Sequence, residues 1–147
     1  MQYRGLRHAG SARNPLDCAS HAVDAGSPQL FRLRHGTVEQ IRLDAQLPLG
    51  MFEETEYHAD QFSLDPGDRL VIVSSGVHAA QRAGSSVFGE RGLRETIAAT
   101  RSASAHETAR AVVDGLVQYH GGGDLPTDAA VVCLDWRGSP SLGGTRA

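Results

Sequence analysis

Two short segments place polar side chains at the ends of apolar runs, where a chemical site could form. Ser74, Ser75 and Gly76 follow the apolar run RLVIV, and Thr127 with Asp128 precedes the apolar run AAVVCLDW. A serine hydroxyl becomes a nucleophile only when a neighbouring base activates it. No His-Asp partner at a recognisable nucleophile elbow accompanies these serines. The sequence therefore does not predict a serine hydrolase.

Other polar groups do not predict a metal site either. The seven histidines show no HxxxH or HExxH spacing, and the two cysteines form no CxxC pair. Gly121 to Gly123 could form a nest of amides for an anion, although a helix C-cap followed by a connector is the favoured interpretation. Glu53, Glu54 and Glu56 are typical of a solvated loop.

The composition limits the class of protein. The chain has 147 residues, 40% of them hydrophobic, and a net charge of −3, which suits one globular domain without a basic patch for nucleic acid. No apolar run approaches the length of a membrane span, so no membrane association is expected. The widely spaced cysteines favour a reduced, cytoplasmic protein.

The first half of the chain has the alternating pattern of β-strands. A hairpin is expected over 29–43, because His35 and Gly36 provide a two-residue turn between QLFRLR and TVEQIRL. Further strands are expected at 21–26, 56–64, 69–75 and 129–136.

The pattern changes to helical spacing after the fifth strand. Helices are expected at 90–100 and 104–120, and Ser104 with Glu107 forms a capping box at the start of the second helix. Gly121 is expected to end that helix. Antiparallel strands followed by two helices and a final strand predict an α+β fold, with antiparallel sheets and helices packed on the outside.

From about Val23 to Trp136 the sequence resembles the C-terminal part of a SpoIIE-type phosphatase domain. This is the bacterial branch of the metal-dependent protein serine/threonine phosphatases (the PPM or type 2C class). The segment LDPGDRLVIVSSGVHAA resembles the family pattern LxPGDxLxLYTDGVxEA, and FGERGLRETI resembles FGxxRLxxxL. LPTDAAVVCLDW resembles the closing DDxTLLxLxW. The resemblance implies a partial α-β-β-α sandwich.

The resemblance also implies a metal site, and the residues of this chain can be compared with the family's metal ligands one position at a time. In the family, two Mn²⁺ or Mg²⁺ ions hold a bridging water that attacks a phosphoserine or phosphothreonine. Ser75 stands where the family has the Asp of TDG, before the retained Gly76, and Thr127 stands where it has the first Asp of the closing pair. The early acidic Gly-Asp segment is missing, because residues 1–22 contain Asp17 as their one acidic residue.

Asp128 is the one surviving candidate metal ligand. It is displaced by one residue from the ligand position, and such a shift at a strand end turns a side chain to the opposite face. Hydroxyl groups are poor ligands for a hard dication, which prefers carboxylate oxygens. We therefore expect no metal cofactor to be bound by this chain alone, and Mn²⁺ or Mg²⁺ only if the site is completed.

Three functions follow from these comparisons. The first is a degenerate regulatory module that binds a small phosphoprotein, such as an anti-sigma-factor antagonist, without hydrolysing it. The second is an active phosphatase completed by missing sequence or by a second chain. The third is an unrelated small α+β binding domain.

The domain limits and the oligomeric state are also expectations. Residues 1–22 are expected to be a loosely ordered lead-in, 23–136 the phosphatase-like domain and 137–147 a flexible tail. A C-terminal fragment of a sandwich would expose sheet edges and one sheet face, which favours a homodimer or low solubility.

Overall fold

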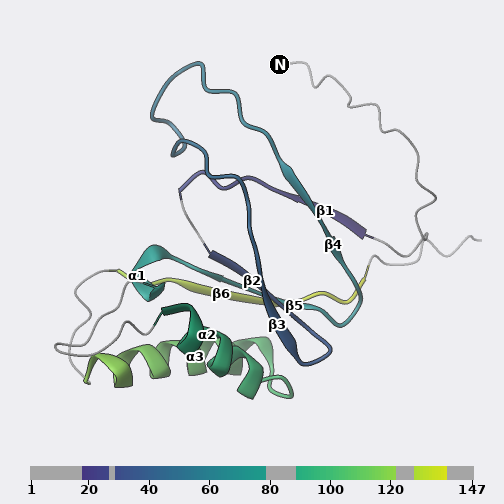
Figure 1. Cartoon of the computed structure of the whole chain (residues 1–147), viewed down its shortest axis with the longest axis vertical. Helices are drawn as coiled ribbons and strands as arrows, with labels where there is room; N and C mark the ends of the chain where they lie inside the picture. Colours follow the sequence, from purple (N-terminus) through teal and green to yellow (C-terminus); the bar gives the residue numbers. More distant parts are fainter. Residues whose placement is uncertain (1–17, 27–28, 79–88, 122–127, 139–147) are drawn as a thin grey trace, which may run out of the picture.

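The computed structural model describes residues 18–26, 29–78, 89–121 and 128–138. The described part forms two antiparallel sheets with helices beside the larger one (Figure 1). The strands are β1 (Cys18–Ala22), β2 (Gln29–Arg34), β3 (Thr37–Ile41), β4 (Asp60–Leu64), β5 (Arg69–Val73) and β6 (Val131–Asp135), and the helices are α1 (Ser75–His78), α2 (Gly89–Ala99) and α3 (Ala105–His120).

A four-stranded sheet in the order β3-β2-β5-β6 is the centre of the fold. The predicted hairpin of β2 and β3 is confirmed, with Leu33 opposite Val38 and Arg34 opposite Thr37. His35 and Gly36 have φ angles of 49° and 82°. Two left-handed residues in a row make the turn whose twist matches that of the flanking strands. Glycine reaches this conformation without the strain that a Cβ atom introduces.

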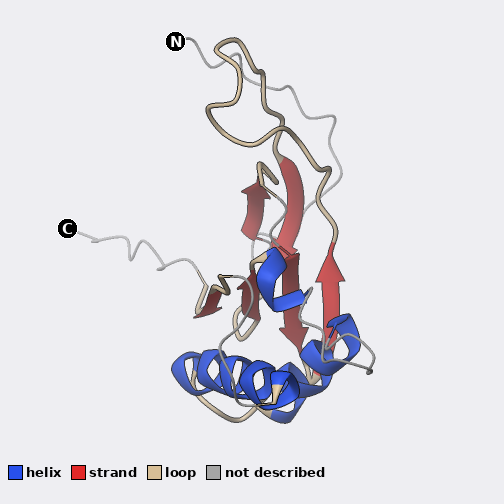
Figure 2. Ribbon diagram, turned by 90° about the vertical axis from the view of Figure 1, so that its left-hand side faces the viewer, coloured by secondary structure: helices blue, strands red, loops and turns tan. Residues whose placement is uncertain are grey.

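Helices α2 and α3 cover one face of this sheet and lie together on one side of the strands (Figure 2). The capping box of α3 is confirmed: the Ser104 hydroxyl accepts a hydrogen bond from the Glu107 backbone N–H, and the Glu107 carboxylate accepts one from the Ser104 backbone N–H. Gly121 ends α3 with a left-handed φ of 91°. The buried residues between helices and sheet are Phe31, Leu33, Val71, Val73, Val77, Leu93, Ile97, Val112 and Leu116.

The two-stranded sheet of β1 and β4 packs on the opposite face of the larger sheet. Leu64 of β4 lies with Leu30 and Leu70 in a second apolar cluster, against which Phe62 and Trp136 also pack. The guanidinium of Arg32 on β2 donates a hydrogen bond of 2.5 Å to the carbonyl of Ser63 on β4. The layers are therefore helix, sheet and sheet, which confirms the α+β fold with helices outside antiparallel sheets.

Several strand limits differ from the predicted ones. The first strand occupies Cys18–Ala22 and not 21–26, so it begins inside the segment expected to be a loosely ordered lead-in. Its partner β4 fixes this register by placing Cys18 opposite Leu64 and Ala22 opposite Asp60. After β1 the chain bends away, and Asp24 forms a single bridge to Ala45. The rest of the lead-in and most of the expected tail lie outside the described residues.

Side-chain hydrogen bonds close the base of the long connection from β3 to β4, and in one of them the Asp60 carboxylate accepts from the Asp44 N–H at 2.7 Å. β4 begins at Asp60 and not at residue 56. The backbone of His58 bonds instead to the Gln46 amide, which accepts from its N–H at 2.9 Å and donates to its carbonyl at 2.7 Å. A glutamine side chain thus provides the bonds that a neighbouring strand would otherwise provide. Beyond this closure, Leu49 and Phe52 are 74% and 63% exposed.

Candidate functional site

The two segments singled out in the sequence meet at one end of the larger sheet. β5 and β6 are antiparallel neighbours, with Val73 opposite Val131. One residue further on, the Ser74 N–H donates to the Ala130 carbonyl at 3.0 Å, and the Ala130 N–H donates to the Ser74 hydroxyl at 2.9 Å. These bonds extend the ladder past the strand ends. The turn after β5 and the segment before β6 are therefore held side by side.

The turn after β5 is a single helical turn. The chain ends β5 at Val73, earlier than the predicted 75, and Ser75 begins α1 with an exposed side chain. Gly76 is buried, and it is not among the residues with positive φ. The bend from strand to helix is therefore made without a left-handed glycine. Val77 is fully buried in the core and fixes the position of the turn.

The described residues at this end provide few candidate ligands for a divalent cation. Asp128 is exposed beside the Ser74–Ala130 pair, and Thr127 lies outside the described residues. Within the described ranges, no group of three or more His, Cys, Asp or Glu side chains could hold a metal ion. A hydroxyl at Ser75 with one carboxylate at Asp128 does not fit Mn²⁺ or Mg²⁺, which take several charged oxygen ligands.

Two other carboxylates lie near the opposite end of β5 and bind arginines: Asp68 directly precedes β5, and Asp135 is the last residue of β6. Asp68 is 2% exposed and accepts hydrogen bonds of 2.8 and 2.6 Å from the Arg34 guanidinium. Burial acts to raise the pKa of Asp68, but the hydrogen bonds from Arg34 and from the Asp65 backbone N–H outweigh it, so this pKa lies below its usual value. Hydrogen bonds from Arg69 likewise lower the pKa of Asp135.

Arg69 is the most extensively bonded of these charged groups. Its guanidinium donates to both Asp135 carboxylate oxygens, at 2.6 and 3.0 Å, and to the Thr108 hydroxyl at 2.6 Å. It also donates to the carbonyls of Thr100 and Ala103, at 3.1 and 2.7 Å. It therefore ties both strands to the start of α3. Such a group is structural, because its donors are already used.

The other polar residues singled out in the sequence have structural or solvent-exposed positions in the fold. Gly121 is a helix C-cap, while 122 and 123 lie outside the described ranges. Glu53, Glu54 and Glu56 are exposed. Cys133 is a free thiol whose pKa is raised by burial, which keeps it protonated and unreactive at neutral pH.

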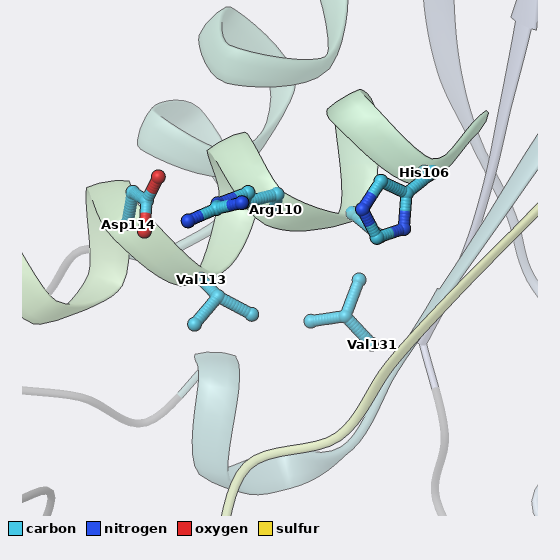
Figure 3. Close-up of a pocket in the computed structure, with 6 residues that line it drawn as sticks. His106, Arg110, Val113, Asp114 and Val131 are labelled. Atoms are coloured by element: carbon cyan, nitrogen blue, oxygen red, sulfur yellow. The ribbon is translucent and has the colours of Figure 1, made fainter. Parts of the chain in front are cut away.

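A groove between α3 and β6 was not predicted from the sequence. It has a volume of about 380 Å³ and is lined by His106, Ala109, Arg110, Val113 and Asp114 of α3 and by Val131 of β6 (Figure 3). These helix positions recur at intervals of three and four residues and so share one side of α3. The spacing was visible in the sequence, but only the fold shows that this side borders the edge of the sheet.

Comparisons with known proteins agree with the fold. The sequence model of the family Stage II sporulation protein E (SpoIIE) matches residues 13–137. A search of curated proteins found no match. In the described part of the chain, no helix has the length and apolar character that crossing a bilayer requires.

Three solved structures illustrate the likeness. The PP2C phosphatase domain of the cell fate determinant SpoIIE from Bacillus subtilis, solved with a fragment of its regulatory domain, superposes with a TM-score of 0.65 at 18% identity, over 84% of this chain and 35% of that chain. The Mn-presoaked phosphatase domain of the same protein superposes with a TM-score of 0.60 at 15% identity, over 84% of this chain and 58% of that chain. The SiaA-PP2C domain of Pseudomonas aeruginosa superposes with a TM-score of 0.60 at 19% identity, over 76% of this chain and 44% of that chain.

These structural likenesses establish the fold, and the family match covers most of the sequence. The chain spans 35 to 58% of the length of these three structures. The family match also excludes an unrelated small α+β domain, the third expectation from the sequence. The chain belongs to the SpoIIE family.

Proposed function

We propose that this chain is a degenerate SpoIIE-type phosphatase module that binds a phosphoprotein partner and does not hydrolyse it. The proposal depends on one observation. At the turn after β5, where the family pattern has the metal-binding carboxylate, this chain presents the neutral hydroxyl of Ser75. The neighbouring backbone keeps its place through the Ser74–Ala130 bonds. The turn thus has a well-fixed backbone and a neutral side chain at this position.

The loss of charge matters because hydrolysis in this family depends on the metal ions. A metal-bound water becomes a nucleophile near neutral pH because the bound cations lower its pKa. Replacing a charged oxygen by a hydroxyl removes most of the attraction for a hard dication. Recognition of a phosphoprotein by the surrounding surface does not require that water, so binding can persist without catalysis.

The proposed partner is a small phosphoprotein of the anti-sigma-factor antagonist kind, and the proposed setting is bacterial phospho-signalling in the cytoplasm. Family membership supports this class of partner. The test uses the purified chain with such an antagonist in its phosphoserine form and in its unphosphorylated form. Calorimetry should detect binding of one or both forms. Absence of binding to either form at 100 μM, roughly the limit of a specific signalling contact, would exclude this partner class.

Hydrolysis is tested separately. With 1 to 5 mM Mn²⁺ (roughly the range that saturates weak sites) and a phosphoserine peptide, we expect phosphate release no faster than the background without protein. An active SpoIIE-type phosphatase assayed in parallel serves as the positive control. Turnover well above background by this chain would refute the degenerate module.

A second candidate function is an active phosphatase completed by further sequence or by another chain. The observation that favours it is the partial coverage of its relatives, because the chain spans 58% of the Mn-presoaked phosphatase domain. Asp128 is also exposed at the correct end of the sheet. Titration with Mn²⁺ should give heat or a rise in melting temperature if a site exists. If neither appears until a second chain carrying the part of the domain that the relatives have in addition is supplied, completion in trans is supported.

A further inference from the structure

The edge of the larger sheet at β6 offers free backbone groups. Among the described strands β6 pairs with β5 alone. The Ser74 N–H bonds to Ala130 and the Trp136 N–H bonds to Asp68, so the even-numbered residues 130 to 136 direct their backbone groups toward β5. Antiparallel ladders alternate. The N–H and C=O groups of Val131, Cys133 and Asp135 therefore point away from the sheet, where another strand can bind them.

The side of α3 that borders this edge is partly apolar. Figure 3 shows Val113 of α3 and Val131 of β6 beneath the helix, with His106, Arg110 and Asp114 along the same side of it. Val113 is 40% exposed. A groove with an apolar floor beside an open strand edge is typical of a surface that binds another chain.

The charges at the rim of the groove have no partner within the described part of the chain. Arg110 and Asp114 are four residues apart on α3, yet no ion pair joins them or either of them to another described residue. On α2 the pairs Arg91–Glu95 and Glu90–Arg94, with the same spacing, are formed at 2.8 and 2.6 Å. The groove therefore presents one positive and one negative group that are both available.

We infer that this surface binds a second copy of the same chain across a two-fold axis. β6 of one copy pairs antiparallel with β6 of the other, and the two α3 helices lie side by side over the joined sheets. Arg110 of each copy faces Asp114 of its partner. The two-fold axis makes each such contact occur twice.

The occupant is a second copy because the surface is complementary to itself. A two-fold interface requires each surface to carry both members of every pair. The groove carries the acidic Asp114 and the basic Arg110, so each can face the other in a second copy. Its apolar floor can pack against the same floor of that copy, and the edge of β6 alternates hydrogen-bond donors and acceptors. A strongly charged peptide would match one of the two rim charges and oppose the other.

The decisive experiment exchanges the charges between copies. Arg110→Glu places two acidic groups at each rim contact, and Asp114→Arg places two basic groups there. Each variant alone should dissociate at least 10-fold more readily than the unchanged chain in sedimentation and light scattering. An equimolar mixture of the two variants should restore dimers, because the introduced carboxylate of one copy then faces the introduced guanidinium of the other. This rescue is not expected if the residues have only a structural role.

Arg91→Glu is the matched control. It creates the same like-charge pair at a four-residue spacing, with Glu95, on an exposed part of α2. It should leave the dimer unchanged, and circular dichroism should show that all three variants remain folded. A monomeric unchanged chain, single variants that stay dimeric, or a mixture that stays monomeric would each overturn the inference.

Hydrogen exchange on the unchanged chain gives an independent test that involves no substitution. Raising the protein concentration should slow exchange of the amides of Val131, Cys133 and Asp135, which point away from β5. The amides of Val132 and Leu134 are bonded within the chain and should change little. Equal exchange at low and high concentration for the first group would overturn the pairing of strand edges.

Discussion

The two ends of β5 differ in the kind of interaction that holds them. At its start, Asp68 and Arg69 are buried and form ion pairs with Arg34 and Asp135. Just past its end, Ser74 is held to Ala130 by hydrogen bonds between neutral groups. Both ends keep β5 in register with β6. The start of β5 is therefore held by ion pairs, and the segment just past its end is held by hydrogen bonds between neutral groups.

The largest expected effect comes from removing the charge at the start of β5. Arg69→Met should lower the free energy of unfolding by about 3 kcal/mol, near the lower end for broken buried pairs, because Asp135 remains 38% exposed and can be hydrated. Urea unfolding followed by circular dichroism measures this loss. Arg91→Met is the control, since that arginine is 91% exposed and its loss should leave the urea midpoint almost unchanged. Equal losses for both variants would show that the burial of Arg69 does not matter.

The second prediction concerns pH and the buried carboxylate at the same end. The pKa of Asp68 is lower in the folded protein than its usual value. Its contribution to stability should be complete above about pH 4, the ordinary pKa of an aspartic acid, and should be lost as the pH falls through the lower folded pKa. Asp68→Asn should flatten the fall in melting temperature over this acid range. A variant that follows the unchanged chain at every pH would contradict the role of Asp68.

A smaller effect is expected at the neutral end. Ser74→Ala removes the hydroxyl that accepts from the Ala130 N–H, while the backbone bond between the two residues remains. The loss should be about 1 kcal/mol, as for a single hydrogen bond between neutral groups. Thermal unfolding measures it. A loss as large as that of Arg69→Met would remove the distinction between the two ends.

The smallest effect is expected when charge is added at the neutral end. Ser75 is exposed, so Ser75→Asp should change the free energy of unfolding by less than about 0.5 kcal/mol. With Asp128 it should still provide too few ligands for two cations, so calorimetry with Mn²⁺ should show no binding. Ser75→Asn is the uncharged control. Strong binding of Mn²⁺ by the aspartate variant would show that this end needs only one carboxylate to become a metal site.

Local signals explain the parts of the fold that the sequence predicted correctly. The His35-Gly36 turn and the Ser104–Glu107 capping box each depend on residues at most three positions apart. Both were identified from residue type and spacing alone. The limits of β1 and β4 depend on pairing between Cys18 and Leu64, which are far apart in sequence, and on the Gln46 amide. Alternation of polar and apolar residues does not encode such distant partners.

The candidate site was predictable as a location but not in its detailed shape. The sequence placed Ser75 and Asp128 at the ends of apolar runs, and the pairing of β5 with β6 brings those ends together. The single helical turn at Ser75 was not predicted, because two serines and a glycine are equally compatible with an open loop. The groove at Arg110 and Asp114 depends on which strand lies at the edge of the sheet, a property of the whole topology.

The hydrogen bonds between the Gln46 amide and the His58 backbone affect how well the β3–β4 connection can accept insertions and deletions. Because the amide fastens the base of the β3–β4 connection at His58, the segment between those two residues is separated from the sheets, and Figure 1 shows it projecting beyond β1 and β4. Insertions or deletions around Leu49 and Phe52 can therefore accumulate without shifting the register of either strand. This tip is the natural position for grafting a foreign epitope or a fluorescent tag.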